Sequence, residues 1–394
     1  MCTDENNMHL ERYFTETASL KEEGMYRSIP RIEGQGKWIK EIGAGPDAPV
    51  FLNLSSNDYL GIFEKEELVK EFLARTELPR FSAASSRLLT GNCSAYHHLE
   101  ELLCRIYRKE AALLFNSGYH ANVGILPALC GKDSLIIADK LVHASIIDGI
   151  RLSGCNFIRF RHNDCGHLES ILKKEYNAYT TIFVVTESIF SMGGDEAPLR
   201  ELAGLKAAYP RIMLYVDEAH AFGVCGDSGL GLSEKYGLLE EVDILVATMG
   251  KAICSVGAFA VCPRILKEYL VNKMRPLIFS TALPPVNIEW SRFIIEKLPG
   301  FAPEREHLAG ISGWLRKELG NTGSNSHIIP FVTGDACKAV ELSRRLMENN
   351  IYALPVRPPT VPPGNAGIRI SLTAAVTRPE MENLVQTIFN LLKT

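Results

Sequence analysis

Each of three short apolar runs in this chain is followed by polar side chains of types that do chemistry. The pairs are Glu187 and Ser191 after TIFVV (181–185), Asp217 and His220 after IMLYV (212–216), and Thr248 and Lys251 after DILVA (243–247). Because the carboxyl ends of parallel strands meet at one edge of a sheet, these side chains are expected to gather there. The sequence therefore predicts a site that combines carboxylates, an imidazole and a lysine.

Lys251 is the only charged residue in the sixteen-residue stretch VATMGKAICSVGAFAV (246–261). An ammonium in an apolar setting is costly unless it finds a counter-charge, loses its proton or reacts. A neutral lysine amine can form a Schiff base with the aldehyde of pyridoxal 5′-phosphate, and that is the chemistry predicted here. The alternative is a surface lysine that extends into water, which is the commoner fate of this residue type.

A pyridoxal cofactor would need further partners. Its ring nitrogen stays protonated beside a carboxylate, and Asp217 suits that role at the end of a buried strand. The spacing of three residues lets His220 reach the same cofactor. Its phosphate needs backbone N–H groups at the start of a helix, which Gly118 and Tyr119 offer in NSGYHANVGIL.

Simpler interpretations exist for two of these groups. Asp217 and Glu218 could cap the helix that follows their strand. His143, in ADKLVHASI, could be a histidine at a helix start with no ligand. The conjunction of polar groups at successive strand ends is what favours the catalytic interpretation.

The elements that must position these residues alternate between strands and helices from about residue 111 to 261. Four apolar runs (135–138, 181–185, 212–216 and 243–247) are separated by amphipathic segments such as 167–176 and 198–209. This alternation predicts a parallel or mixed sheet with helices on both faces.

A second, smaller unit follows a helical stretch near residues 285–320. Its pattern reads strand, helix, strand, strand and helix, at 328–332, 338–349, 351–356, 368–373 and 381–393. We therefore expect an α+β domain. The predicted division is an N-terminal arm (1–50) that packs on one or both domains, a large domain (51–295) and a small C-terminal domain (296–394).

The composition of the chain disfavours nucleic-acid binding, secretion and membrane insertion. With 46% hydrophobic and 22% charged residues and a net charge of −4, the chain is typical of a globular protein without a basic surface for nucleic acid. The N-terminus MCTDENNMHLERYF lacks the basic start and apolar core of a secretory signal. No apolar run approaches the roughly 20 residues that span a bilayer. We expect a cytoplasmic protein that acts on small molecules without contacting membranes.

Other kinds of site are disfavoured. The ten cysteines are scattered without a C-x-x-C pair, and HNDCGH (162–167) lacks a fourth ligand at a familiar spacing, so no metal is predicted. GAGPDA (43–48) lacks the third glycine of a dinucleotide-binding loop, and GDSGL (226–230) lacks the final glycine of a nucleophile elbow.

Four strings in order, VVTESIFSMGGDEAPL, VDEAHAFGVCGDSGLG, TMGKA and FSTALPP, resemble the α-oxoamine synthases, pyridoxal-phosphate enzymes of the fold-type-I aminotransferase class. The similarity runs from SSNDYLG (55–61) to SLTAA near residue 375. It implies an α/β fold with a large, mostly parallel seven-stranded sheet, helices on both of its faces, and a smaller α+β C-terminal domain. Such enzymes condense an amino acid with an acyl thioester and release carbon dioxide.

The resemblance implies roles for individual residues. Lys251 would be the aldimine lysine, Asp217 the partner of the ring nitrogen, His220 the contact to the phenolic oxygen, and His143 the residue that stacks on the ring. Thr281, in FSTALPP, would reach the phosphate of the neighbouring subunit, which implies a homodimer with shared active sites. The remaining cofactor-binding residues would be Gly118, Tyr119, Glu187, Ser191 and Thr248.

Within the family, the stretch VRPPTVPPGNAGIRISLTAA (356–375) and HND (162–164) point to members that join L-alanine to a pimeloyl thioester in biotin synthesis. Arg369 would hold the amino-acid carboxylate with Asn57, because arginine grips a carboxylate through two parallel hydrogen bonds. His143 would also contact the substrate. Arg357 and Thr360 would line the acyl path, although Arg357 could instead anchor a loop.

Two alternatives stay open. A sister synthase would use glycine with acetyl-CoA or another acyl thioester, and a non-catalytic subunit would keep the fold without the chemistry.

The chain also departs from the family pattern, with SAASSR (82–87) in place of a glycine-rich run, and Cys254 and Ala258 in place of glycines. These departures remove the backbone freedom of glycine and concern loop detail and substrate fit. Coenzyme A and a carrier protein present the same thioester, so the sequence does not choose between them.

Overall fold

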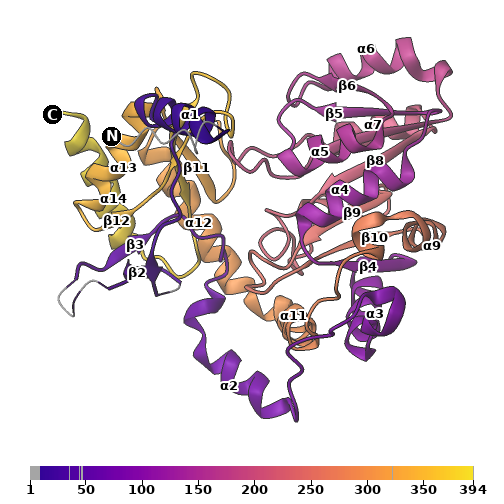
Figure 1. Ribbon diagram of the computed structural model, residues 1–394, viewed down its shortest axis with the longest axis horizontal. Coiled ribbons are helices and arrows are strands. Elements are labelled where there is room, and N and C mark those ends of the chain that lie inside the picture. Colours follow the sequence, from indigo (N-terminus) through magenta and orange to yellow (C-terminus); the bar gives the residue numbers. More distant parts are fainter. Residues whose placement is uncertain (1–8, 35, 44, 46–47, 322, 394) are drawn as a thin grey trace.

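The computed structural model describes residues 9–393, except for 35, 44, 46–47 and 322. In this part of the chain the strands form sheets of seven, four and three strands. The seven-stranded sheet and its helices form the large unit on the right of Figure 1, and the three-stranded sheet lies in the smaller unit on the left. No helix in the described part is long and apolar enough to cross a membrane.

The large sheet confirms the predicted fold class. Its spatial order is β4-β10-β9-β8-β7-β5-β6. Strands β5 to β9 pair with one another in parallel, whereas β10 runs antiparallel to both β4 and β9. The bounds are β4 (Ala111–Phe115), β5 (Ser134–Asp139), β6 (Asn156–Phe160), β7 (Thr181–Glu187), β8 (Ile212–Asp217), β9 (Ile244–Thr248) and β10 (Ala258–Cys262).

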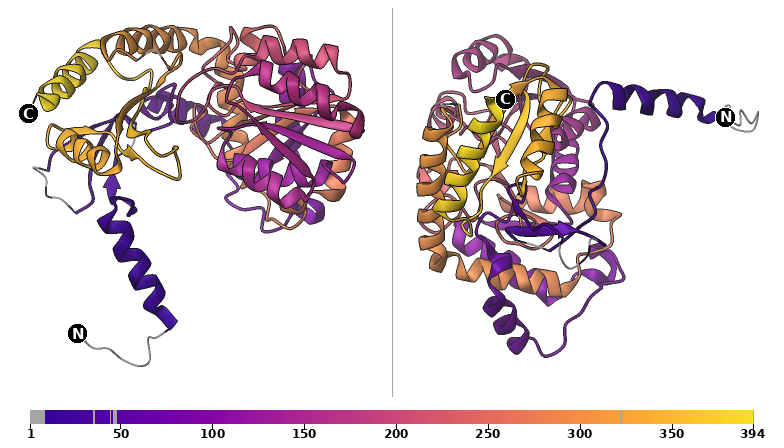
Figure 2. Two further views of the ribbon diagram at one scale, coloured as in Figure 1. Left: turned by 90° about the horizontal axis from the view of Figure 1, so that it is seen from above. Right: turned by 90° about the vertical axis from the view of Figure 1, so that its left-hand side faces the viewer.

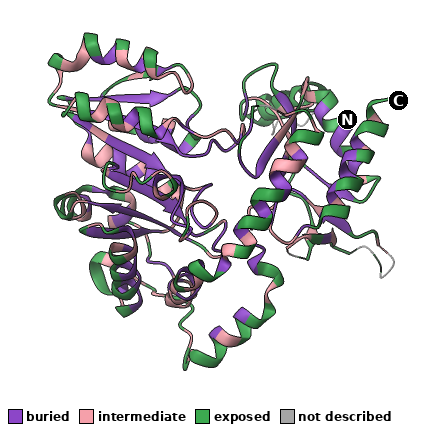
Figure 3. Ribbon diagram, turned by 180° about the vertical axis from the view of Figure 1, so that it is seen from behind, coloured by how far each residue is buried: buried purple, intermediate pink, exposed green. Residues whose placement is uncertain are grey.

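The central strands form because their sequences are apolar throughout. Every residue of β4, β5, β9 and β10 is buried, as expected for strands covered by helices on both faces. Figure 2 shows helices on both sides of the sheet, and Figure 3 shows the buried strands between helices whose outer faces are exposed.

The helices of the large unit agree with the amphipathic segments read from the sequence. The predicted segments 167–176 and 198–209 correspond to α6 and α7, each within two residues at either end. The bounds are α2 (Glu66–Arg75), α3 (Ser94–Tyr107), α4 (Gly118–Leu129), α5 (Ala144–Ser153), α6 (Cys165–Glu175), α7 (Leu199–Ala208), α8 (Leu232–Lys235), α9 (Arg264–Lys273), α10 (Arg275–Ile278) and α11 (Pro285–Lys297), with short turns η2 (Ile62–Glu64), η3 (Arg87–Gly91) and η4 (Tyr176–Ala178).

The small unit has the predicted mixture of strands and helices, with one correction. The run 351–356 is not one strand, because β12 (Ile351–Tyr352) pairs in parallel with β3 (Phe51–Asn53), while β13 (Pro355–Val356) pairs with β14. The chain changes sheet at Leu354, whose N–H donates to Ser55 Oγ instead of to a strand. The other elements are η5 (Leu298–Phe301), α12 (Ala302–Glu318), β11 (Ile328–Gly334), α13 (Ala336–Met347), β14 (Ala366–Ser371) and α14 (Arg378–Leu392).

The N-terminal arm packs on the rest of the chain only in part. Strands β1 (Ile32–Glu33) and β2 (Trp38–Glu41) join β3 and β12 in the four-stranded sheet. Helix α1 (Glu11–Glu22) projects away from the body in Figure 2, and none of its residues is buried against the described chain. The predicted boundary between residues 295 and 296 falls inside α11, which continues through η5 into α12. The division into domains stays a prediction.

A close contact between α4 and α5 helps to position Asp217 at the carboxyl end of β8. Gly149 of α5 lies against Asn122 of α4, and a Cβ added at Gly149 would overlap the carbonyl oxygen of Asn122. The side chain of Asn122 in turn donates to Asp217 at the end of β8. The absence of a side chain at Gly149 therefore sets the distance between two helices and the placement of a buried carboxylate.

We predict that Gly149→Ala lowers the free energy of unfolding by about 1–3 kcal/mol, because the added methyl group forces α5 away from α4. Gly204→Ala is the matched control, since Gly204 also lies in a helix, α7, and no described atom lies within 4 Å of its added Cβ. Alanine there should be neutral or stabilise by up to about 1 kcal/mol through helix propensity. Denaturant unfolding of both variants measures the difference, and equal effects would contradict the packing argument.

Candidate active site

The strand register brings the predicted residues to one edge of the sheet. Glu187 and Asp217 are direct neighbours on β7 and β8, and Asp217 pairs with Val246 on β9, two residues before Thr248. Lys251 lies in the turn after β9, where the predicted edge continues. Parallel pairing therefore converts three distant sequence positions into one polar cluster.

This cluster surrounds a cavity of about 170 Å³. Eight of its eleven lining residues were predicted from the sequence, and the other three are Asn122, Ser145 and Ala219. The predicted eight are Gly118, Tyr119, His143, Glu187, Asp217, His220, Thr248 and Lys251.

Lys251 is the reactive group that the geometry singles out. Burial lowers the pKa of Lys251 to about 8, even though the carboxylates Asp217 and Glu187 act in the opposite direction. Its Nζ lies 2.8 Å from Nε2 of His220. A substantial fraction of the amine is therefore neutral near pH 8, which a nucleophilic lysine requires.

The side chain of Asp217 lines the cavity and accepts two hydrogen bonds. Asn122 Nδ2 donates to its Oδ2 at 2.8 Å, and the Ala219 N–H donates to its Oδ1 at 2.9 Å. Tyr215 fixes Asn122 by donating to its Oδ1 at 2.5 Å. The capping interpretation applies mainly to the neighbouring Glu218, whose carboxylate accepts from two backbone N–H groups at the start of α8.

Glu187 is buried beside Asp217, and its Oε1 has no hydrogen-bond partner among the described residues. Burial first, and then the charge of Asp217, raise the pKa of Glu187 well above its ordinary value. The raised pKa favours the protonated form of Glu187 beside Asp217.

The N-terminus of α4 offers an anion-binding surface. Ser117 caps the helix by accepting from the His120 N–H, which leaves the first-turn amides of Gly118 and Tyr119 without partners inside the helix. The space beside Gly118 is open, since an added Cβ would come no closer than 3.7 Å to Thr248. A phosphate can therefore approach these amides closely.

His143 lies at the start of a helix and also beside the cavity. It caps α5, because its Nδ1 accepts from the Ser145 N–H at 3.2 Å. The residue also lines the cavity and is exposed to solvent. Capping fixes the orientation of the ring and does not compete with contact to a ligand.

A second group of predicted residues lies next to the cavity. Arg369 on β14 donates from Nε to the carbonyl oxygen of Ser191 at 2.6 Å and from Nη1 to Asn57 Oδ1 at 3.3 Å. Asn57 accepts from Tyr59, whose hydroxyl also contacts His220. Arg369, Asn57 and Ser191 are therefore connected to the cavity through Tyr59.

Three predicted residues lie elsewhere in this chain. Arg357 donates to the carbonyl oxygen of Gly24, which lies in the N-terminal arm. Thr360 is exposed and accepts from Arg27 of the same arm at 3.3 Å. Thr281 is exposed, and its carbonyl oxygen accepts from an asparagine side chain. None of the three lines the cavity around Lys251.

Comparisons with known proteins agree with this geometry. The model of the family described as aminotransferase class I and II matches residues 49–388. The chain belongs to this family. The 8-amino-7-oxononanoate synthase of Haemophilus ducreyi is 52% identical over 387 residues, which cover 95% of this chain and 99% of that protein.

Solved structures resemble this member of the aminotransferase class I and II family along most of its length. Serine palmitoyltransferase from S. paucimobilis, with a bound PLP–myriocin aldimine, superposes with a TM-score of 0.87 at 27% identity, and covers 98% of this chain and 97% of its own. The 8-amino-7-oxononanoate synthase from Francisella tularensis gives a TM-score of 0.72 at 26% identity, over 87% of this chain and 98% of its own. The predicted family is thereby confirmed.

The departures from the usual family pattern have different structural consequences. Cys254 adopts a left-handed backbone with φ of +51°, and its N–H closes the turn by donating to the carbonyl oxygen of Lys251. A non-glycine residue is strained there by about 1–2 kcal/mol. Ala84, in SAASSR, is likewise left-handed, with φ of +50°. Ala258 lies in the extended strand β10, where no glycine is required.

Sequence reasoning on this family member missed Tyr59, Asn122 and His327. Tyr59 and Asn122 lie in the quoted stretches SSNDYLG and NSGYHANVGIL, so a signal was present for both, whereas His327 lies in a stretch that was not quoted for its polar residues. His327 packs edge-on against Tyr59 with ring centroids 4.0 Å apart. Burial lowers its pKa to about 3, so the ring is neutral.

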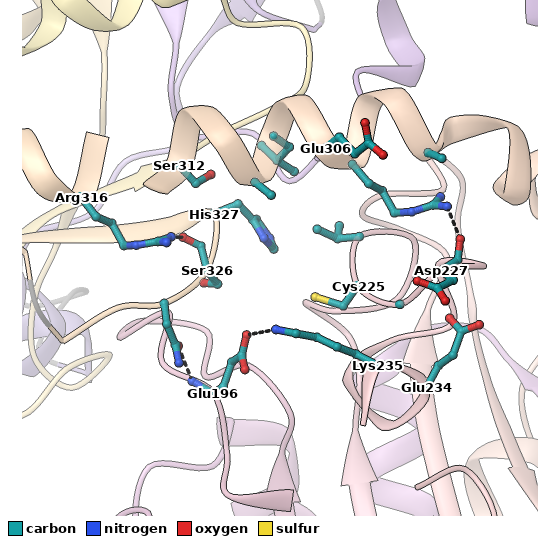
Figure 4. A pocket seen from close by; sticks show the side chains of 17 residues that line it. Glu196, Cys225, Asp227, Glu234, Lys235, Glu306, Ser312, Arg316, Ser326 and His327 are labelled. Carbon is teal, nitrogen blue, oxygen red and sulfur yellow. Dashed lines mark hydrogen bonds and ion pairs between the residues drawn. The ribbon is translucent and has the colours of Figure 1, made fainter. Parts of the chain in front are cut away.

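A larger cavity of about 580 Å³ lies behind His327, between α12 and the loop before α8. Figure 4 shows Glu306, Ser312 and Arg316 of α12 above the cavity and Cys225 and Lys235 below it. Lys235 is paired with Glu196 at 2.9 Å, and Arg316 donates to the carbonyl oxygen of Ser326. None of the predicted site residues lines this larger cavity.

In the HND segment (162–164), His162 connects two aspartates from different parts of the large unit. His162 lies between two carboxylates, with its Nδ1 2.9 Å from Asp139 and its Nε2 2.7 Å from Asp195. Burial lowers the pKa of His162, but the hydrogen bonds and charges of both aspartates outweigh it and raise the pKa to about 9. Among the described residues no group of histidine, cysteine and acidic side chains is arranged to hold a metal ion.

We predict that His162→Gln destabilises the protein by an amount that depends on pH. Because the folded pKa is raised above the ordinary 6.5, the stabilisation is complete below about pH 6.5 and is lost as pH rises through about 9. The loss should be on the order of 2 kcal/mol at pH 6 and much smaller at pH 10. Urea unfolding at both pH values measures it, with the exposed His98→Gln as control, and a loss that does not change with pH would contradict the ion-pair account.

Proposed function

We propose that the chain is a pyridoxal-phosphate-dependent acyltransferase that joins L-alanine to a pimeloyl thioester. The products are 8-amino-7-oxononanoate, carbon dioxide and the free thiol, as in biotin biosynthesis. The single observation that carries the chemistry is a partly buried lysine of lowered pKa beside two carboxyl groups and an imidazole at the sheet edge. The substrates follow from the named relative that is 52% identical over nearly the whole chain.

The residues around the cavity fit the cofactor. Lys251 Nζ would hold its aldehyde carbon, Asp217 would pair with its protonated ring nitrogen, and the backbone N–H groups of Gly118 and Tyr119 would donate to its phosphate. His143 presents an exposed ring for stacking. When bound, pyridoxal phosphate supplies an electron sink for the α-carbon of the amino acid.

Lys251 is proposed to act as the base as well as the cofactor anchor. In its neutral form Nζ takes the proton from the α-carbon of L-alanine and later returns one. A pKa of about 8 suits both steps near neutral pH. Because the pKa of Glu187 is raised, its carboxyl group has a weaker tendency to ionise and to stabilise Lys251 as an ammonium.

Arg369 is proposed to bind the carboxylate of the amino acid, with Asn57 beside it. The guanidinium now donates to the carbonyl oxygen of Ser191 and to Asn57 Oδ1, so it is already oriented. A preorganised guanidinium loses little freedom when a carboxylate arrives. The thioester carbonyl carbon then joins the α-carbon, the thiol leaves, and the carboxylate departs as carbon dioxide. Coenzyme A and a carrier protein would both present this thioester.

Arg357 and Thr360 remain the proposed lining of the acyl path. Both lie near the N-terminal arm, where Arg357 contacts Gly24 and Thr360 contacts Arg27. An acyl chain that passes there would meet Arg27 and Arg357, two cations able to bind a terminal carboxylate. The arm would then form part of the substrate path.

A homodimer with shared active sites is part of the proposal. Thr281 and Ser86 form an isolated antiparallel β-bridge. Leu89 of η3 follows Ser86 by three residues and is exposed. Phe81 and Phe279 are exposed in the neighbouring sequence. Large exposed apolar side chains close together are typical of protein interfaces. A second copy seated there would cover them and could bring Thr281 to the phosphate of the other subunit.

The cofactor-loaded protein should release free thiol from L-alanine plus pimeloyl-CoA but not from glycine plus acetyl-CoA. Thiol release in parallel reactions measures the preference. Release only with the second pair would keep the reaction class and overturn the proposed substrates. Release with neither pair, including with pimeloyl carrier protein as donor, would favour a non-catalytic subunit.

Lys251→Ala should lower turnover below detection, because the variant lacks both the anchor and the base. Lys174→Ala is the control, since Lys174 is highly exposed on α6. Sodium borohydride should attach the cofactor permanently to native protein and to the control, but not to Lys251→Ala, as intact mass spectrometry reports. Substantial steady-state activity in Lys251→Ala would contradict the assignment.

Light scattering should give a mass twice that of the 43.7 kDa chain. Leu89→Asp should shift the mass toward a single chain, because a carboxylate would be buried without a partner in the interface. Ile265→Asp is the control, since Ile265 is also exposed but lies at the start of α9, outside the segments around Ser86 and Thr281. A native mass of one chain would exclude the shared site.

A further inference from the structure

A chain of hydrogen bonds leads from Arg369 on β14 to Lys251 through the side chains of Asn57, Tyr59 and His220. Arg369 Nη1 contacts Asn57 Oδ1 at 3.3 Å, and the Tyr59 hydroxyl donates to the same oxygen at 2.9 Å. The Tyr59 oxygen lies 2.7 Å from His220 Nδ1, and His220 Nε2 lies 2.8 Å from Lys251 Nζ. Tyr59 and His220 are buried, so water does not compete for the contact between them.

The orientation of the Asn57 amide is fixed by its neighbour. A guanidinium has only donors, so the atom of Asn57 that faces Arg369 must be the oxygen. The same atom faces the Tyr59 hydroxyl. Because the oxygen has no hydrogen to give, the single hydrogen of the phenol must point to Asn57.

The position of the phenol hydrogen decides the tautomer of His220. With its hydrogen on Asn57, the Tyr59 oxygen can only accept, so His220 Nδ1 must carry the hydrogen of that contact. Arg369 Nη2 also donates to the Tyr59 oxygen, although at 3.5 Å, which is consistent with an acceptor. The imidazole is neutral, because burial and then Lys251 lower the pKa of His220 well below its ordinary value. A neutral ring with hydrogen on Nδ1 has a lone pair on Nε2.

We propose that Asn57 and Tyr59 are positioning residues that hold His220 with its hydrogen on Nδ1, so that Nε2 accepts a hydrogen bond from Lys251. The neutral amine then donates one hydrogen to His220, and its own lone pair stays free for a carbonyl carbon in the cavity. The other tautomer would donate from Nε2 to that lone pair and block the nucleophile. The consequence for reactivity rests on the proposed role of Lys251, whereas the tautomer itself does not.

The full chain without cofactor, with ¹⁵N-labelled histidine, gives a direct test, because a nitrogen with a lone pair and one with a hydrogen resonate far apart. His220→Gln assigns the signals. We expect Nε2 of His220 to show the lone-pair signal and Nδ1 the N–H signal near neutral pH. The reverse assignment in native protein would overturn the proposal, and this result needs no variant at Tyr59.

Tyr59→Phe removes the acceptor for the Nδ1 hydrogen, so the two tautomers should become mixed or reversed. Tyr107→Phe is the control, because Tyr107 is also buried and its hydroxyl donates to the carbonyl oxygen of Leu230, far from any histidine contact. The control should leave the His220 signals unchanged. A folded Tyr59→Phe whose His220 signals match the native ones would also overturn the proposal.

A second readout separates this inference from the proposed function. The rate at which added pyridoxal phosphate becomes trapped on Lys251 by borohydride, followed by mass spectrometry, should fall about tenfold in Tyr59→Phe and stay near native in Tyr107→Phe. An unchanged rate despite a changed tautomer would overturn the effect on Lys251. If native protein shows the expected tautomer but never captures the cofactor, the proposed function fails and the tautomer assignment stands.

Discussion

The burial of one ammonium group is the constraint on which the rest of the site depends. Lys251 lies in an apolar turn after β9, and removing its charge from water lowers its pKa to about 8. The carboxyl groups of Asp217 and Glu187 act against this lowering but do not overcome it. Burial in turn raises the pKa of Glu187 well above its ordinary value. The reactivity of the amine is thus set by how much negative charge the sheet edge holds.

Layers of supporting contacts keep this balance in place. The close approach of α5 to α4 at Gly149 fixes Asn122, which orients Asp217, and Tyr215 completes the contact from β8. On the other side, Tyr59 links the small unit to His220 through Arg369 and Asn57. The groups that touch Lys251 are therefore positioned from both units, so a change in their relative position would alter the amine.

Much of this arrangement could be predicted from the sequence, because it depends on local patterns. Continuous apolar runs predicted the central strands, and polar residues directly after them predicted Glu187, Asp217, Thr248 and Lys251 at one edge. The prediction of a single strand over 351–356 was wrong. The N–H of Leu354 donates to Ser55, almost 300 positions earlier, and the chain changes sheet there. Such long-range competition leaves no periodic signal.

The sequence by itself determined the α/β class and the residue types that lie at the strand ends, since burial on both faces demands apolar runs and the ends of parallel strands share an edge. Only the tertiary structure decided which polar atoms meet. Tyr59 and His220 are 161 positions apart, and Arg357 binds the arm at Gly24 across 333 positions. Hydrogen-bond partners depend on distances of a few tenths of an ångström between separate elements, which no local pattern encodes.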